Sequence, residues 1–128
     1  YAAFPVPPDR VEEAVRGLAA AGCAGLNVTI PHKRAVLAAC SGVSDAVLAI
    51  GAANTLVPDG SGGYRADNTD APGFLRALDE QAPLELRGRE ALLVGAGGAA
   101  RAVAFALRSR GARVRVANRT RTRAEALG

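Results

Sequence analysis

The stretch Ala91-Leu92-Leu93-Val94-Gly95-Ala96-Gly97-Gly98-Ala99-Ala100 decides the fold of the second half of the chain. Its four leading apolar residues predict a short strand buried on both faces, as in a parallel sheet. A glycine turn follows directly, and the next residues have helical periodicity up to Gly111. Val114-Arg115-Val116-Ala117 predicts a second strand. We therefore expect residues 90–128 to contain one β-α-β unit with the glycines at its first strand-to-helix turn.

Each small residue of this turn suits a bound dinucleotide. Gly95 permits a tight turn, Gly97 lets the backbone approach a pyrophosphate, and Ala100 stands where a third glycine allows close packing of helix and strand. A helix start offers N–H groups and a partial positive charge. The predicted phosphate-binding residues are Gly95, Ala96, Gly97, Gly98, Ala99 and Ala100. A Gly- and Ala-rich turn without a ligand is the alternative.

The end of the second predicted strand indicates which dinucleotide binds. NAD-binding units place Asp or Glu about twenty residues past the glycines, where it binds the ribose 2′-hydroxyl. Here Asn118-Arg119-Thr120 occupies that place, with Arg121 and Arg123 just beyond. A guanidinium would pair with a 2′-phosphate, so the sequence predicts NADP. The alternative is a solvated, arginine-rich helix start.

Composition and charge exclude several classes of protein. The 128 residues are 49% hydrophobic and 22% charged, which is typical of a globular chain. The net charge of +4 divides into −4 over residues 1–86 and +8 over residues 87–128. A basic half suits nucleic acid or a phosphorylated small molecule, but aromatic residues are only 4%, which disfavours base stacking. We expect no nucleic-acid partner.

No apolar run approaches the ~18 residues of a membrane span, and no secretory leader is visible. Cys23 and Cys40 are isolated thiols without the spacing of a metal site. We therefore expect a cytoplasmic protein with no membrane association and no metal. The chain has no Met and ends at Gly128 within an expected helix, which indicates a piece of a longer chain lacking both ends.

The first half predicts alternating helices and strands. Asp9 and Glu12 have the spacing of a capping box before a helix that ends at Gly22. Further predicted elements are a strand at 26–30, a helix at 31–40, a helix capped by Ser44, a hairpin of 53–57 with 64–68, and a helix from Asp70. We expect an α/β domain over 1–81, a linker over 82–89, and the start of a dinucleotide-binding domain over 90–128.

Three stretches carry polar residues at predicted strand ends. They are Asn27-Val28-Thr29-Ile30-Pro31-His32-Lys33, Ala52-Ala53-Asn54-Thr55 and Asn68-Thr69-Asp70. Amides and hydroxyls suit a polyhydroxylated ligand, because both donate and accept hydrogen bonds. Lys33 is the one lysine of the chain, and lysine can give up a proton where arginine cannot. Capping of turns and helices is the alternative for each residue alone.

In their order and spacing, these stretches resemble the shikimate dehydrogenase family. The resemblance includes Tyr1 and Phe4, Gly25 to Lys33, Gly51 to Leu56, Asp67 to Asp70 with Gly73-Phe74, Gly95 to Ala100, and Asn118 to Thr120. It extends over the whole chain. Departures from the family pattern are Ala53, Ala66 and Ala71-Pro72, which bear on fine specificity more than on reaction type.

The resemblance implies a two-domain α/β enzyme, with a Rossmann-type NADP-binding domain, that reversibly reduces 3-dehydroshikimate to shikimate with NADPH. The family's catalytic pair falls on Lys33 and Asp70, and its substrate contacts fall on Thr29, Lys33, Asn54 and Asp70. Its NADP contacts fall on residues 95–100 and on Asn118, Arg119, Thr120 and Arg123.

Alternatives remain at this point. A quinate/shikimate dehydrogenase of broader specificity belongs to the same superfamily, and a non-catalytic NADP-binding module belongs to a different class. A homodimer of the full-length parent is open, because the sequence is silent on oligomeric state. Only two strands of the nucleotide domain fall within the chain, fewer than a stable sheet usually needs. We therefore expect residues 1–128 alone to be poorly folded and inactive.

Overall fold

The computed structural model describes residues 1–127 and divides the chain into two compact units. Unit 1 is residues 1–68, and unit 2 begins at Thr69. Helices and strands alternate along both units, so the α/β class predicted from the sequence is confirmed. This division reflects the contacts that residues make within each unit. It does not test the domain limits expected at 81 and 90, which stay a prediction.

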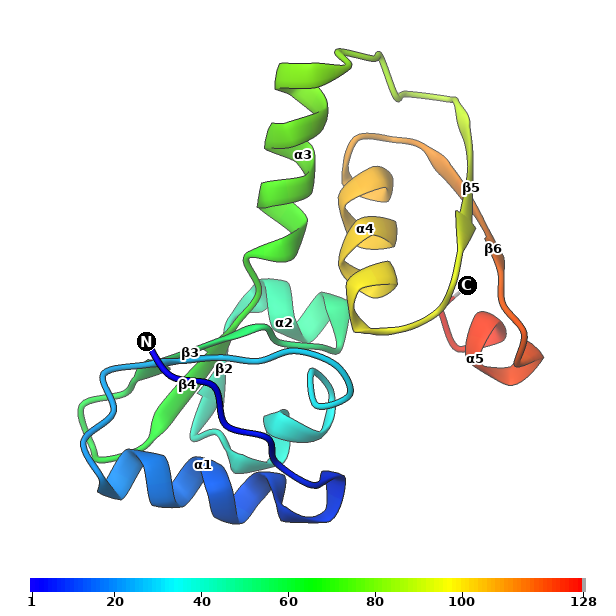
Figure 1. Ribbon diagram of the computed structural model, residues 1–128. Helices are drawn as coiled ribbons and strands as arrows, with labels where there is room; N and C mark the ends of the chain where they lie inside the picture. The colour runs from blue at the N-terminus through cyan, green and yellow to red at the C-terminus, as the bar shows by residue number, and fades with distance from the viewer. Residues whose placement is uncertain (128) are drawn as a thin grey trace. The chain divides into compact units, whose positions relative to one another are not determined.

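Unit 1 is built around a four-stranded mixed sheet (Figure 1). The strand order is β1-β3-β4-β2, with β1–β3 and β3–β4 antiparallel and β2–β4 parallel. The elements of unit 1 are η1 (Pro8–Arg10), α1 (Val11–Ala20), β1 (Leu26–Asn27), η2 (Ala35–Ala39), β2 (Gly42–Val43), α2 (Asp45–Ile50), β3 (Thr55–Pro58) and β4 (Tyr64–Asp67). The β3–β4 hairpin is the one predicted from the sequence.

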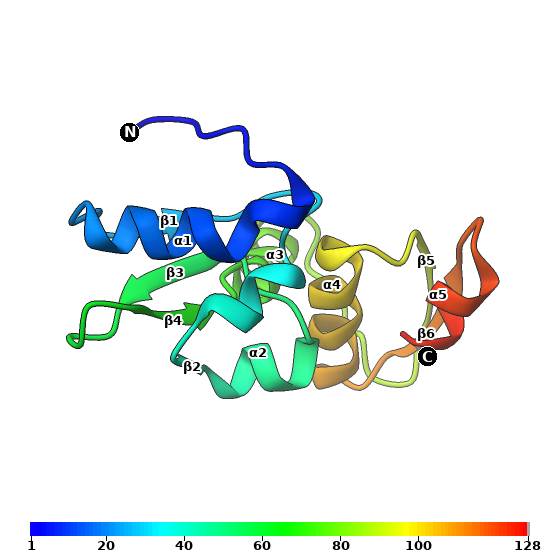
Figure 2. The ribbon, with the colours of Figure 1, turned by 90° about the horizontal axis from the view of Figure 1, so that it is seen from below.

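The core of unit 1 lies on one face of this sheet. Leu56, Tyr64 and Ala66 are each at most 1% exposed, while their neighbours Val57 and Arg65 on the opposite face are exposed. This is the period-2 alternation of a sheet with one buried face. The helices complete the core through the buried side chains Val11, Val15, Val36 and Val47. Figures 1 and 2 show α1 running beside the strands.

Of the two helix caps predicted for unit 1, one is wrong and one is confirmed. The predicted capping box does not form, because the N-cap of α1 is Arg10 and no side chain caps it. Instead, a 3₁₀ turn containing Asp9 precedes the helix. The cap of α2 is confirmed, since the Ser44 hydroxyl accepts a hydrogen bond from the Val47 N–H at 3.3 Å.

The strand and helix predicted around Lys33 are shorter than expected. The strand predicted over 26–30 is reduced to β1, and the helix predicted over 31–40 is replaced by a turn followed by the 3₁₀ helix η2. The Lys33 carbonyl accepts a hydrogen bond from the Ala53 N–H at 2.7 Å. A carbonyl directed to another segment does not close a helical turn of its own. This long-range bond therefore explains why the helical periodicity of 31–40 does not produce an α-helix.

Unit 2 contains α3 (Asp70–Gln81), β5 (Glu90–Val94), α4 (Gly98–Ser109), β6 (Arg113–Ala117) and α5 (Arg121–Glu125). Strands β5 and β6 pair in parallel, with Leu93 opposite Val116. Helix α4 lies between α3 and the two strands (Figure 1). An ion pair at 2.6 Å between Arg110 and Asp79 also joins the end of α4 to α3. The predicted β-α-β unit is therefore confirmed.

The prediction that β5 is buried on both faces is wrong. Within the described residues 1–127, one face of β5 is half-buried and the other is exposed. Leu92 and Val94 are 71% and 81% exposed, whereas Ala91 and Leu93 are half-buried. The half-buried face of β5 and β6 is the one that the helices cover, through apolar α4 residues such as Ala102 and Leu107. None of the helices among residues 1–127 is long and apolar enough to span a membrane.

Candidate active site

A segment of two buried residues and one half-buried residue, Ala52–Asn54, connects the predicted site residues of unit 1. We call it the hub segment. Its Ala53 N–H donates to the Lys33 carbonyl at 2.7 Å, and its Asn54 carbonyl accepts from the Val28 N–H at 2.7 Å. Ala52 and Ala53 have no exposed surface. The hub segment therefore brings together the stretches that carry Thr29, Lys33 and Asn54.

The predicted ligand groups of this region reach the surface to different extents. Thr29 is exposed, whereas Lys33 and Asn54 are half-buried. The Asn54 amide is oriented by its neighbour, because the Thr55 hydroxyl donates to Asn54 Oδ1 at 2.9 Å. A fixed amide, a hydroxyl and an ammonium within one part of a fold suit a polyhydroxylated molecule.

The third predicted stretch begins at the end of β4 and crosses from unit 1 to unit 2. Asn68 is the last residue of unit 1, while Asp70 is half-buried and is the first residue of α3. Within unit 1 the Asp67 carbonyl accepts from the Asn54 N–H at 3.1 Å. The structure thus brings the start of this stretch to the hub segment, while the pairing of Lys33 with Asp70 stays a prediction.

In unit 2 the glycine turn lies between β5 and α4, as predicted. Gly95 has a φ of +114°, a conformation that glycine adopts without strain. Its N–H donates to the Ala117 carbonyl at 2.7 Å. This bond extends the pairing of β5 with β6, so the turn and residues 118–120 lie at the same edge of the sheet. The glycine turn therefore begins next to the end of β6, which residues 118–120 follow.

The basic residues beyond β6 differ in their surroundings. The Asn118 amide donates to the Thr120 carbonyl at 2.8 Å, which closes the turn that presents Arg119. Arg121 is paired with Glu125 at 2.8 Å on the exposed face of α5. Arg119, Thr120 and Arg123 are exposed.

The start of α4 fits the pyrophosphate of a dinucleotide. The Arg101 N–H donates to the Gly97 carbonyl at 3.0 Å, so the N–H groups of residues 98–100 precede the first hydrogen bond of the helix. A Cβ added at Gly95 or Gly97 would meet no atom within 4 Å, which leaves open space beside these donors. Donors, open space and the helix dipole together suit an anion.

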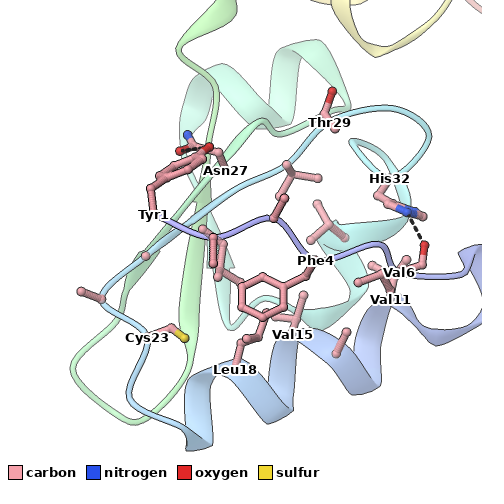
Figure 3. Close-up of a pocket in the computed structure, with 18 residues that line it drawn as sticks. Tyr1, Phe4, Val6, Val11, Val15, Leu18, Cys23, Asn27, Thr29 and His32 are labelled. Carbon is pink, nitrogen blue, oxygen red and sulfur yellow. Dashed lines mark hydrogen bonds between the residues drawn. The ribbon is translucent and has the colours of Figure 1, made fainter.

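A separate hollow of about 530 Å³ lies in unit 1 under the N-terminal segment (Figure 3). Its lining is largely apolar, and Figure 3 shows the Phe4 ring directed towards Val15 and Leu18. Thr29 and His32 line it, but Lys33 and Asn54 do not. A polyhydroxylated substrate needs more polar partners than this lining offers, so we do not assign the hollow as the substrate site.

The sequence analysis names Asn68, Ser44 and His32 but does not predict the long-range hydrogen bonds that their side chains make. Asn68 donates from Nδ2 to the Ala52 carbonyl at 2.9 Å, and Ser44 donates to Asp67 Oδ1 at 2.7 Å. His32 Nε2 lies 2.8 Å from the Val6 carbonyl, which ties the turn before Lys33 to the N-terminal segment. Their types and positions were visible in the sequence, but their partners lie 16 to 26 residues away.

The fold and site define an α/β protein in which a substrate-type site precedes the first β-α-β unit of a dinucleotide-binding domain. Two family models match this arrangement. The shikimate dehydrogenase substrate binding domain matches residues 1–56, and the shikimate / quinate 5-dehydrogenase family matches residues 77–128. The chain belongs to the shikimate dehydrogenase family.

Relatives and solved structures agree with this assignment. The shikimate dehydrogenase (NADP(+)) of Methanopyrus kandleri is 52% identical over 99% of this chain and 44% of its own length. Shikimate dehydrogenase from Aquifex aeolicus superposes with a TM-score of 0.88 at 38% identity, over 97% of this chain and 46% of that one. Shikimate 5-dehydrogenase from Thermus thermophilus, solved with NADP(H) and shikimate, superposes with a TM-score of 0.81 at 44% identity, over 95% and 45%. The chain thus spans a little under half the length of these proteins.

Proposed function

We propose that this chain carries the substrate site and part of the cofactor site of an NADP-dependent shikimate dehydrogenase, which reversibly reduces 3-dehydroshikimate to shikimate. The observation that carries the proposal is the 2.7 Å hydrogen bond from the Ala53 N–H to the Lys33 carbonyl. This bond connects Lys33, which carries the amine of the family's substrate site, with the hub segment, which carries the Asn54 amide. The relatives named for this activity support the proposal.

In the proposed reaction Lys33 handles the proton. The cofactor, when bound, supplies or accepts the hydride. When shikimate is oxidised, the Lys33 amine accepts the hydroxyl proton of the reacting carbon, and in reduction the ammonium returns a proton to the carbonyl oxygen. Asp70 orients Lys33 and the same hydroxyl, and its negative charge favours the ammonium form. Thr29 and Asn54 donate and accept hydrogen bonds at the other hydroxyls.

The proposed cofactor is NADP, held by chain groups of unit 2. The backbone of Gly95, Ala96, Gly97, Gly98, Ala99 and Ala100 forms the pyrophosphate cradle beside the start of α4. Arg119 and Arg123 pair with the 2′-phosphate, and Asn118 and Thr120 hold the turn between strand and helix. The pairing of Arg121 with Glu125 supports the choice of Arg119 and Arg123 as phosphate ligands.

The experiment that tests the function is NADP⁺ reduction by the full-length protein, followed at 340 nm with shikimate, with quinate and with neither. We expect turnover with shikimate only. Equal turnover with quinate favours the broader quinate/shikimate dehydrogenase, a reading that the family model for residues 77–128 also allows by its description. NADPH binding without turnover of either substrate identifies a non-catalytic binding module and overturns the proposal.

We also propose a cellular location for the full-length protein and a test of its oligomeric state. Cys23 and Cys40 are free thiols, and burial raises the pKa of the Cys40 thiol. Two thiols that form no disulfide within residues 1–127 suit a reducing compartment, which supports a cytoplasmic location. Light scattering of the full-length protein tests whether it forms a homodimer. The substrate and the cofactor are the proposed small-molecule partners.

A further inference from the structure

The hub segment joins several parts of the candidate site although it has little side-chain chemistry of its own. Ala52 bonds through its carbonyl, Ala53 through its N–H, and Asn54 through both backbone groups. These four bonds reach three segments of unit 1, at Val28, at Lys33 and at residues 67–68. Two of its three side chains are methyl groups. The position of the hub segment therefore depends on what its backbone groups bind.

Asn68 provides the side chain that holds this backbone. It is 3% exposed, and it is the one polar residue in the buried class among residues 1–127. Its Nδ2 donates to the Ala52 carbonyl at 2.9 Å. A buried amide is expensive to desolvate unless its hydrogen bonds are made, so a bond at this position fixes both partners.

The backbone of Asn68 is also held by a hydrogen bond. Its backbone N–H donates to Asp67 Oδ1 at 2.8 Å, and the Ser44 hydroxyl donates to the same oxygen at 2.7 Å. Ser44 also caps α2 through the Val47 N–H. Asn68 thus connects a helix cap on one side with the hub segment on the other.

We infer that Asn68 is a positioning residue for the candidate active site, because its amide holds the hub segment and thereby sets the separation of Lys33 from Asn54. The inference rests on the proposed function. We assign Asn68 a positioning role because its Nδ2 donates to the backbone carbonyl of Ala52. An Asp at this position has the same shape but presents a carboxylate oxygen to the Ala52 carbonyl, and a Leu has no donor at all.

The test compares Asn68→Asp and Asn68→Leu with the wild type in the full-length protein. We measure kcat and KM for shikimate per folded molecule, counting folded molecules by NADPH binding. We expect kcat/KM to fall at least about tenfold, with KM raised as well as kcat lowered, because a misplacement of about 1 Å can reduce turnover about 10²-fold. The Kd for NADPH is expected to stay at the wild-type value, since the glycine turn lies in unit 2.

Ser44→Ala is the matched control. It removes the cap of α2 and one bond to Asp67 but leaves the bond from Asn68 to Ala52. We expect a lower melting temperature with wild-type kcat and KM. If both Asn68 variants keep wild-type constants per folded molecule, or if Ser44→Ala changes the constants as much as they do, the inference is wrong. A wild-type protein without shikimate turnover contradicts the proposed function instead.

Discussion

The two candidate sites of this chain are held by different means. In unit 1, Lys33 and Asn54 depend on hydrogen bonds between segments distant in sequence, such as Ala53 to Lys33 and Asn68 to Ala52. In unit 2, the glycine turn depends mainly on the conformation of a few adjacent residues and on the start of α4, and one bond from Gly95 to Ala117 joins it to the next strand. The first site therefore depends on tertiary contacts, whereas the second depends largely on local structure.

This difference has a consequence for burial. The hub segment has no exposed surface at Ala52 and Ala53, so a change there must be accommodated by the packed core. The glycine turn adjoins open space, so a change there acts mainly on the ligand. Substitutions in unit 1 are therefore expected to affect chemistry and stability together, while those in unit 2 are expected to affect cofactor affinity.

The largest expected effect is the loss of the Lys33 amine. Lys33→Ala and Lys33→Arg should each lower kcat with shikimate by about 10²- to 10⁴-fold, because neither side chain exchanges a proton near neutral pH. The Kd for NADPH should not change, as titrated by fluorescence. Arg34→Ala, an exposed neighbour on the same turn, serves as the control and should keep wild-type turnover. An equal loss in turnover and cofactor affinity contradicts the role of Lys33.

The next effect belongs to the glycine turn. Gly95→Val places a branched side chain at a φ of +114°, which costs about 1–3 kcal/mol and fills the space beside the helix start. If the turn relaxes by moving, NADPH binding should weaken roughly tenfold to a hundredfold. Isothermal titration measures this Kd.

Gly88→Val is the matched control, because Gly88 also has a positive φ of +75° and open space around it. A branched side chain is strained at this φ as well, but Gly88 lies outside the glycine turn. We expect lower stability and an unchanged Kd for NADPH. Similar weakening in both variants would show that strain alone, and not the cradle, determines affinity.

The contrast between the two units also explains how much the sequence could predict. The β-α-β unit was predicted because glycine, helix and strand preferences act over a few neighbouring residues. The turn that carries Lys33 was predicted as a helix, since its periodicity is local while the bond from Ala53 that prevents the helix is not. Asn68 gave no local signal of its partner, because a buried Asn and a capping Asn look alike in sequence.

A smaller effect is expected at Arg119, because its side chain is exposed and solvent weakens its charge. Arg119→Ala should weaken NADPH binding roughly tenfold, the lower part of the range for a charge-assisted hydrogen bond, and should leave NADH binding unchanged. Arg121→Ala removes a guanidinium already paired with Glu125 and serves as the control. Equal weakening of NADPH and NADH contradicts the assignment of Arg119 to the 2′-phosphate.

The smallest effect concerns Asp59, which lies in unit 1 in the turn between β3 and β4. Its carboxylate accepts hydrogen bonds from the Ser41 hydroxyl and from the N–H groups of Ser61 and Gly63 in the turn between β3 and β4. These bonds hold the pKa of the Asp59 carboxyl well below its usual range, with the Ser41 hydroxyl contributing most. Because the folded-state pKa is lowered, the stabilisation is present above the unfolded value of about 3.9 and is lost as the pH falls below it.

Asp59→Asn tests this dependence. The variant should unfold at a lower urea concentration than the wild type at pH 5 to 7. The difference should shrink as the pH is lowered through about 4 towards 2, because the Asp59 carboxyl of the unfolded wild-type chain becomes protonated in this range. The difference should be modest at every pH, because the carboxylate is close to solvent. A difference that stays constant down to pH 2 would show that the geometry of the turn, and not the charge of Asp59, provides the stabilisation. In that case the turn between β3 and β4 would depend on backbone conformation, as the glycine turn does, in contrast to the hub segment, which the Asn68 side chain holds.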